Sequence, residues 1–240
     1  MPNVVVLTAG LAGSSVVTGL LARGGLWTGH ETFRKSDYDT HENLRLIELN
    51  RKLFDSVGFD GNYESEYPDW VAEAIQQKSA DIDQQPFVDF IADCNAHQPW
   101  IWKDPRLSLT LGGWARWLDL PSIHFVLVRR EPLQSWVSNI RRRHIESYRY
   151  HREYNESIWN RLEAFCRERE APYLPLVYED LMVQPEQTLE RLNQFLHLQL
   201  DLTDLQAVFS GKLGRRQHGV VNFTNALAIY LKNFGQRRTA

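Results

Sequence analysis

The chain has 240 residues, of which 43% are hydrophobic and 24% are charged, so it is long enough for one domain with a full core. A formal net charge of −3 argues against nucleic acid as a partner, and two cysteines are too few for a disulfide framework. The apolar runs are far shorter than the ~20 residues that span a bilayer, and no secretory signal precedes them, so we expect a cytoplasmic protein without a membrane span.

Four short apolar runs predict the strands of a parallel sheet. They lie at residues 4–7, 99–102, 123–128 and 173–177, and their continuous apolar character is typical of strands buried on both faces. Helical patterns separate them. This alternation predicts an α/β protein with three layers, α/β/α, around a central parallel sheet of four to five strands, similar to nucleotide kinases with a P-loop. We expect a single domain over residues 1–240.

Apolar residues at helical spacing fill the segments between these runs. A stripe of leucines predicts a helix over residues 42–57, in which Thr40 is the expected N-cap. Trp70 lies on another expected helix and is assigned to the core. The remaining expected helices span residues 16–22, 67–77, 86–96, 107–118, 133–143, 158–169 and 185–196.

A glycine and serine loop connects the first strand to the first helix. Its residues are Gly10, Leu11, Ala12, Gly13, Ser14 and Ser15. Glycines let backbone N–H groups converge on a phosphate, and the start of a helix adds partial positive charge. The serines can cap the helix and donate to phosphate oxygens. The loop lacks the GK[ST] ending of a Walker A motif, and taken alone it fits a tight turn with a serine N-cap equally well.

Two other strand ends carry cations. Arg130 follows the run at 123–128, and Ser138 comes eight residues later, so both can reach one phosphate. An ion pair for Arg130 and a surface position for Ser138 are the alternatives. Lys103 follows the run at 99–102 and is a mobile point charge, suited to a group that is being transferred.

Carboxylates at the same strand ends have an expected structural role. Asp104 is expected to pair with Lys103 or Arg106, and Glu179 and Asp180 are expected to hold the corner between the last strand and the helix that follows it.

The order of these segments resembles the family of sulfotransferases that use 3′-phosphoadenosine 5′-phosphosulfate (PAPS). The matching segments are GLAGSS, KDPR, VLVRREPLQSWVSN and YEDLMVQPEQTLERLNQFL, and the resemblance runs from residue 4 to about residue 198. It implies that the loop at 10–15 binds the 5′-phosphosulfate and that Arg130 and Ser138 bind the 3′-phosphate. It also implies that Lys103 lies near the sulfuryl group.

A glycine and basic segment near the C-terminus resembles, loosely, a family loop that binds the 3′-phosphate. It contains Lys212, Arg215 and Arg216, and a solvated basic turn fits these residues nearly as well. The sequence departs from the family at the phosphosulfate loop, where Leu11 or Ala12 stands in the usual place of an arginine or lysine. Arg34, Lys35 and Lys103 are the candidates to supply the missing charge.

Two glutamates are candidates for the general base. The segment at 28–32 resembles the Gly-Glu-Glu-Thr stretch of tyrosylprotein sulfotransferases, which places Glu31 first. The segment at 40–43 resembles a Gly-Tyr-Phe-Glu segment of bacterial members, which places Glu42 second. His41 is expected to be an exposed residue near a helix start. The histidine that cytosolic members use is replaced here by Pro105.

The resemblance therefore implies in-line transfer of a sulfuryl group from PAPS to a hydroxyl or amine, with adenosine 3′,5′-bisphosphate (PAP) as the product. The expected acceptor is a small molecule, a carbohydrate or a lipid, and residues 58–98 are expected to form a helical insertion or lid on its side, with Tyr63 and Tyr67 available for stacking. No metal is expected, because the eight histidines show no ligand spacing. A nucleotide kinase and a degenerate fold that only binds are the alternatives.

Overall fold

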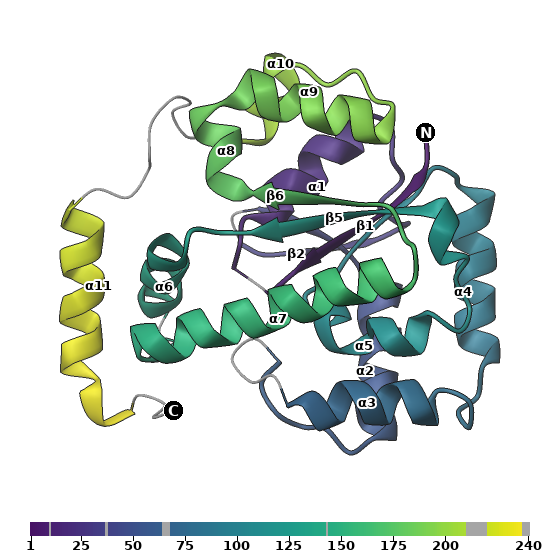
Figure 1. Cartoon of the computed structure of the whole chain (residues 1–240), viewed down its shortest axis with the longest axis horizontal. Coiled ribbons are helices and arrows are strands. Elements are labelled where there is room, and N and C mark those ends of the chain that lie inside the picture. The colour runs from purple at the N-terminus through teal and green to yellow at the C-terminus, as the bar shows by residue number, and fades with distance from the viewer. Residues whose placement is uncertain (10, 37, 64–67, 143, 210–219, 237–240) are drawn as a thin grey trace.

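The computed structural model describes the chain except residues 10, 37, 64–67, 143, 210–219 and 237–240 and the side chain at 236. Its centre is a parallel four-stranded sheet in the order β4-β1-β5-β6. Helices cover both faces of this sheet (Figure 1). The strands are β1 (Asn3–Thr8), β4 (Ile101–Lys103), β5 (Ile123–Arg129) and β6 (Tyr173–Val177). The predicted three-layer parallel fold is confirmed, with four strands in the central sheet.

The first strand forms the middle of two hydrophobic cores. β1 pairs with β4 on one side and with β5 on the other, and residues 4–7 are fully buried. Successive side chains point to opposite faces of a strand. Val5 and Leu7 therefore join one core, and Val4 and Val6 join the other. This double burial explains why the strand sequence is apolar without alternation.

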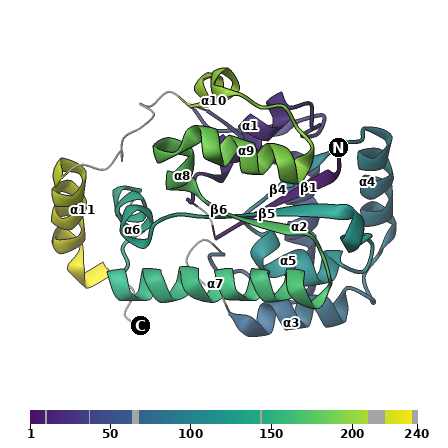
Figure 2. The same ribbon diagram turned by 45° about the horizontal axis from the view of Figure 1, so that its top comes forward.

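The helices form one layer on each face and a pair at one end of the sheet (Figures 1 and 2). One layer contains α1 (Ser14–Arg23), α8 (Tyr178–Val183), α9 (Pro185–Leu196) and α10 (Leu202–Val208). The other contains α2 (Leu44–Ser56), α3 (Asp69–Lys78), α4 (Gln85–Ala96), α5 (Leu107–Trp114) and α7 (Tyr148–Glu168). The pair is α6 (Pro132–Arg141) and α11 (Val220–Lys232), and two short 3-10 helices lie at Leu120–Ser122 and Phe234–Gln236.

Residues 39–43 form a strand, which corrects the predicted helix start. β3 (Asp39–Asn43) pairs antiparallel with β2 (Thr32–Arg34) in a small separate sheet. The Thr40 hydroxyl donates to the Phe33 carbonyl at 2.6 Å and does not cap a helix. Helix α2 begins at Leu44, and its N-cap is Asn43, whose side chain accepts from two backbone N–H groups. The N-cap prediction for Thr40 is therefore wrong.

Helix α7 is longer than predicted, and one aromatic residue is placed differently. α7 begins at Tyr148 with Ser147 as its N-cap, whereas the apolar spacing predicts a start at residue 158. Trp70 is 54% exposed and not in the core, because α3 turns Val71 and Ile75 inward instead. Helices α3 and α4, within residues 58–98, contribute apolar residues to the same core as β1.

The described helices and the two cysteines can be compared with what the composition predicts. No described helix is both long and apolar enough to cross a bilayer. Cys94 and Cys166 are free and buried, and burial raises the pKa of each thiol to about 12.

Candidate functional site

A cleft of about 630 Å³ opens where the strands of the central sheet end. The loop after β1, the last residue of β4, and the residues that follow β5 and β6 all contribute to it, as expected for ligand sites in open parallel sheets. The β2–β3 hairpin and the end of α10 complete the wall. The residues used below are Leu11, Ala12, Gly13, Ser14, Ser15, Lys35, Tyr38, Asp39, Thr40, His41, Glu42, Lys103, Arg130, Ser138, Arg142, Tyr178 and Phe209.

The loop after β1 places the start of α1 in this cleft. Gly13 is the N-cap of α1 and has a φ of 81°, in the left-handed region that favours glycine. A Cβ atom on Gly13 would lie 2.2 Å from the Tyr178 ring, so the loop approaches this ring too closely for any side chain. The N-cap is a glycine and makes no side-chain hydrogen bond to the helix, so the predicted capping by Ser14 or Ser15 is not observed. The helix start therefore offers partial positive charge and two hydroxyl groups to an anion.

A buried ion pair joins the end of β4 to the hairpin. Lys103 is 3% exposed, and its ammonium group pairs with the Glu42 carboxylate and lies 3.4 Å from the Ser15 hydroxyl. Burial raises the pKa of Glu42, although the charge of Lys103 opposes this rise. The pair therefore brings a cation and a carboxylate, which are 61 residues apart in the sequence, to the start of α1.

The hairpin adds His41 and Asp39 to the cleft. His41 has a φ of 57°, and its ring lies against Gly19 of α1, where a Cβ atom would come within 2.7 Å of Nε2. Burial lowers the pKa of His41, which favours the neutral imidazole. Burial alone would raise the pKa of Asp39, but hydrogen bonds from the His41 backbone and the Thr32 hydroxyl lower it. His41 is thus half-buried in the cleft, which corrects the expected exposed position.

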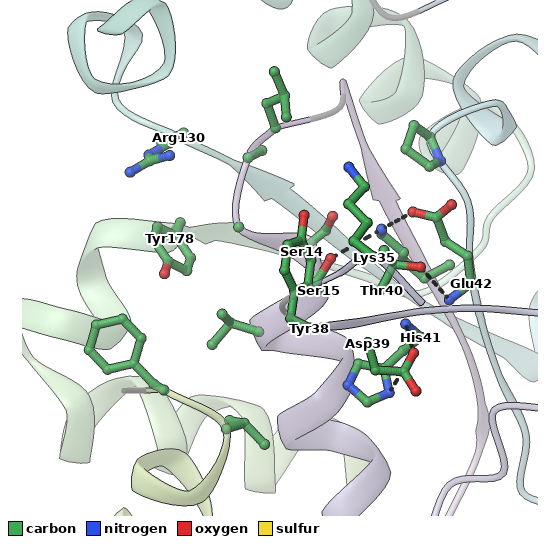
Figure 3. Close-up of a pocket in the computed structure, with 18 of the residues that line it drawn as sticks. Ser14, Ser15, Lys35, Tyr38, Asp39, Thr40, His41, Glu42, Arg130 and Tyr178 are labelled. Atoms are coloured by element: carbon green, nitrogen blue, oxygen red, sulfur yellow. Dashed lines mark hydrogen bonds and ion pairs between the residues drawn. The ribbon is translucent and has the colours of Figure 1, made fainter. Parts of the chain in front are cut away.

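On the other side of the loop, Arg130 lies near Tyr178 (Figure 3). Its guanidinium donates to the Ser138 hydroxyl at 2.8 Å and to the Glu179 carboxylate at 3.2 Å, and it lies 5.3 Å from the Tyr178 ring centre. Glu179 also accepts from the Glu131 backbone at 2.9 Å. The carboxylate therefore holds the corner after β6, as predicted, and it orients Arg130 toward Ser138.

A buried network fixes the strand end that carries Lys103. Asp104 accepts from the Arg106 guanidinium at 2.8 Å and from the Asn50 amide at 2.8 Å. Asn50 in turn accepts from Thr110 at 2.7 Å and from the Trp114 indole at 2.8 Å. The structural role predicted for Asp104 is confirmed, with Arg106 as its partner and Lys103 free to pair with Glu42.

The two candidate bases lie in different places. Glu42 is buried and lines the cleft, whereas Glu31 is exposed and is not among the residues of its wall. Among the candidate cations, Lys35 and Lys103 line the cleft, while Arg34 points to solvent and pairs with Asp39 at 3.3 Å.

Four predicted site residues, Gly10, Lys212, Arg215 and Arg216, lie outside the described residues. The cleft also contains residues that the sequence interpretation did not single out for a site. Tyr178 directly follows β6, so the rule that ligands bind at strand ends would have found it. Tyr38, Arg142 and Phe209 carry no local signal and reach the cleft through the fold.

Comparisons with known proteins identify the family. Residues 2–202 match the model of a family described as "Sulfotransferase family". No curated protein matches the chain in sequence. Among solved structures, the chain resembles the sulfotransferase domain from the Synechococcus PCC 7002 olefin synthase, at 20% identity and a TM-score of 0.51, over 100% of this chain and 84% of that one.

It also resembles the sulfotransferase domain from the curacin biosynthetic pathway, at 16% identity and a TM-score of 0.54, over 93% of this chain and 83% of that one. At these identities the likeness concerns the fold, whereas the family match covers most of the sequence. The chain therefore belongs to the sulfotransferase family.

Proposed function

We propose that this protein transfers the sulfuryl group of PAPS to a hydroxyl group, or an amine, of an acceptor and releases PAP. The observation that carries the proposal is the convergence of a helix start, a buried lysine and a buried carboxylate in one cleft. Anion binding alone would need only the first two. The carboxylate supplies a group that can accept the acceptor's proton.

The residues of the cleft suit the chemical groups of PAPS, which supplies the activated sulfuryl group when bound. The start of α1 with Ser14 and Ser15 would hold the phosphosulfate, because backbone and hydroxyl donors fit tetrahedral anions. Arg130 and Ser138, already 2.8 Å apart, would hold the 3′-phosphate. Tyr178 and Phe209 line the same cleft and offer aromatic surface to the adenine ring.

The cation that the loop lacks comes from other elements in this proposal. Leu11 and Ala12 line the cleft without a charge, and Ala12 is only 3% exposed. Lys103 lies within reach of the Ser15 hydroxyl, and Lys35 and Arg142 line the same cleft. Together these three side chains would balance the negative charge of the phosphosulfate.

Glu42 is the proposed general base, in preference to Glu31. A base must lie within hydrogen-bond reach of the proton it removes, and Glu42 lines the cleft whereas Glu31 does not. Its raised pKa also moves the carboxylate toward the range in which a base is effective near neutral pH. When Lys103 turns toward a bound anion, Glu42 loses its counter-ion and its affinity for a proton rises further.

The remaining catalytic effect would come from position and charge. The acceptor oxygen or nitrogen forms a bond to sulfur, its proton passes to Glu42, and the S–O bond to the 5′-phosphate breaks, so that PAP leaves with the electrons of that bond. Lys103 stabilises the charge that develops on the leaving oxygen. By analogy with phosphoryl transfer, this arrangement needs no covalent intermediate on the protein.

The acceptor is proposed to be a small molecule, with a carbohydrate or a lipid as further options. The two similar domains belong to an olefin synthase and to the curacin biosynthetic pathway, which favours a small biosynthetic acceptor.

A ligand titration separates this proposal from a kinase and from a protein that binds neither nucleotide. At a hundred times Kd, a ligand stabilises the folded state by about 2.7 kcal/mol. For a chain of 150–250 residues this corresponds to a rise in Tm of roughly 5–11 °C. PAP should produce this shift and ATP with Mg²⁺ should not. A preference for ATP with Mg²⁺ would favour a kinase, and no shift with either would favour a degenerate fold.

A further inference from the structure

Three potential metal ligands meet outside the cleft. His30 Nε2 lies 3.2 Å from Asp93 Oδ1, and His97 Nδ1 lies 3.6 Å from the same oxygen. One ligand atom from each residue lies within 4.8 Å of the other two. In sequence the three residues show no ligand motif, because His30 is far from the Asp93 and His97 pair.

The fold brings these residues together at the start of β4. Trp27 pairs with Trp100 in an isolated parallel bridge, in which the Trp27 backbone donates to Pro99 and accepts from Ile101. His30 follows Trp27 closely, while Asp93 lies on α4 and His97 directly follows that helix. The bridge therefore holds the segment that carries His30 against the end of α4. Lys103 lies at the opposite end of β4, so this cluster is separate from the cleft.

An aromatic neighbour and a backbone group orient the two imidazole rings. Trp27 stacks on His97 with ring centres 4.5 Å apart, and it meets His30 edge-on at 5.1 Å. His97 Nδ1 also donates to the Asp93 carbonyl at 2.9 Å. A backbone carbonyl on one ring nitrogen is a common outer contact of metal-binding histidines, since it fixes the ring and leaves Nε2 for the metal.

We propose that His30, Asp93 and His97 form a binding site for Zn²⁺. Two imidazoles and one carboxylate are ligands that suit zinc, whereas Mg²⁺ and Ca²⁺ prefer oxygen alone. Ligands at about 2.1 Å in a tetrahedron lie about 3.4 Å from each other, and the distance of 3.2 Å between His30 Nε2 and Asp93 Oδ1 is close to that value. The side chains of the three are 64%, 41% and 38% exposed, so solvent can reach the metal and complete its coordination.

Zinc at this position would tie two parts of the fold together. The segment with His30 leads directly into β2, and Thr32 of β2 pairs with Asn43, next to Glu42. A metal bridge to α4 would restrain the hairpin that carries the proposed base. The site thus adds a structural clamp to one wall of the cleft without contributing an atom to it.

Calorimetric titration of the full chain with Zn²⁺, after treatment with EDTA, tests the site. We expect one saturable site per chain. The His30→Ala and Asp93→Asn variants should each weaken binding by at least roughly 10- to 100-fold, because loss of an outer contact alone has an effect of that size. His197→Asn is the matched control: His197 is an exposed histidine with a φ of 55°, which asparagine tolerates. It should bind Zn²⁺ as the unchanged protein does.

The variants are suited to this test because both should leave the fold intact. His30 is mostly exposed, and asparagine keeps the size of Asp93, so circular dichroism should show folded protein in both cases. Thermal unfolding gives a second readout that is independent of PAPS: Zn²⁺ should raise the Tm of the unchanged chain and of His197→Asn but not of His30→Ala. Absence of a saturable site, or equal affinity in the unchanged chain and both cluster variants, would overturn the proposal.

Discussion

Replacing Glu42 by glutamine separates proton transfer from nucleotide binding. Glutamine keeps the shape of the side chain and an oxygen that can accept from Lys103, but it cannot take a proton. Loss of a general base typically lowers the rate by about 10²–10⁴-fold, which corresponds to roughly 2.7–5.4 kcal/mol of transition-state stabilisation. PAP affinity should stay the same or rise, because Lys103 becomes freer to bind an anion.

The same substitution should have a measurable effect on stability. Lys103 is 3% exposed and Glu42 is 9% exposed, so their pair is screened little by solvent. Removing one partner of a buried ion pair, so that the other charge has no partner, typically lowers the free energy of unfolding by about 3–5 kcal/mol. Because the amide oxygen still accepts a hydrogen bond, we expect a smaller loss of roughly 1–3 kcal/mol in the free energy of unfolding, measured by urea denaturation.

Glu31→Gln is the matched control for this experiment. Glu31 is exposed and lies outside the wall of the cleft, so its replacement should leave turnover, PAP affinity and stability nearly unchanged. The assay is release of PAP in the presence of an acceptor, alongside calorimetric binding of PAP. Full turnover in Glu42→Gln, or a loss of turnover confined to Glu31→Gln, would refute the assignment of the base.

Three further predictions concern the nucleotide side and the pH profile. Arg130→Gln should weaken the binding of PAP by about 10- to 150-fold, which corresponds to roughly 1.5–3 kcal/mol for hydrogen bonds to a charged group. AMP lacks the 3′-phosphate and should bind as before. Equal weakening of the binding of both nucleotides in calorimetry would contradict this role. Gly13→Ala should destabilise the fold by roughly 1–3 kcal/mol and abolish the PAP-dependent rise in Tm, because its Cβ would lie 2.2 Å from Tyr178; an unaltered PAP response would contradict the loop assignment. Because burial raises the pKa of Glu42 and only the deprotonated carboxylate accepts a proton, kcat/KM should fall on acidification with an apparent pKa above that of an ordinary glutamate, and a flat profile over the range in which the protein stays folded would contradict it.

The central sheet was predictable because its strands are apolar, and β1, β4 and most of β5 are buried on both faces, whereas the edge strand β6 is only partly buried. The runs that form β1, β5 and β6 are apolar over four or more residues, which few other structures require. The helices that pack on them show clear stripes, and α9 has the bounds that its spacing predicts. The parallel topology then places the ends of these strands, and the cations next to them, at one edge of the sheet.

The hairpin that carries Glu42 was not predictable in the same way. β3 has the sequence DTHEN, which is polar and lacks the alternation of a half-buried strand. Its polar groups are satisfied by the fold: Thr40 donates to a backbone carbonyl, and Glu42 pairs with Lys103. The pair of Glu42 and Lys103 joins residues that are 61 positions apart, so it depends on the whole fold. The local sequence at 40–43 fits a helix start equally well.

The first half of α7 was missed for a different reason. Its residues are mostly charged or polar, and the helix is supported there by pairs such as Arg149 with Glu153 at 2.8 Å and Arg152 with Glu156 at 3.6 Å. Such pairs at i, i+4 stabilise a helix without an apolar stripe. A prediction from apolar spacing therefore starts the helix only at Ile158, where the buried face becomes continuous.

Transfer of a labelled sulfuryl group from PAPS to a pool of hydroxyl and amine acceptors tests the central claim most directly. The proposed function predicts that label appears on an acceptor in an amount equal to the PAP released, and that Glu42→Gln binds PAP but transfers almost no label. Saturable binding of PAP without transfer to any acceptor class, in the unchanged protein, would contradict the claim that this cleft is catalytic.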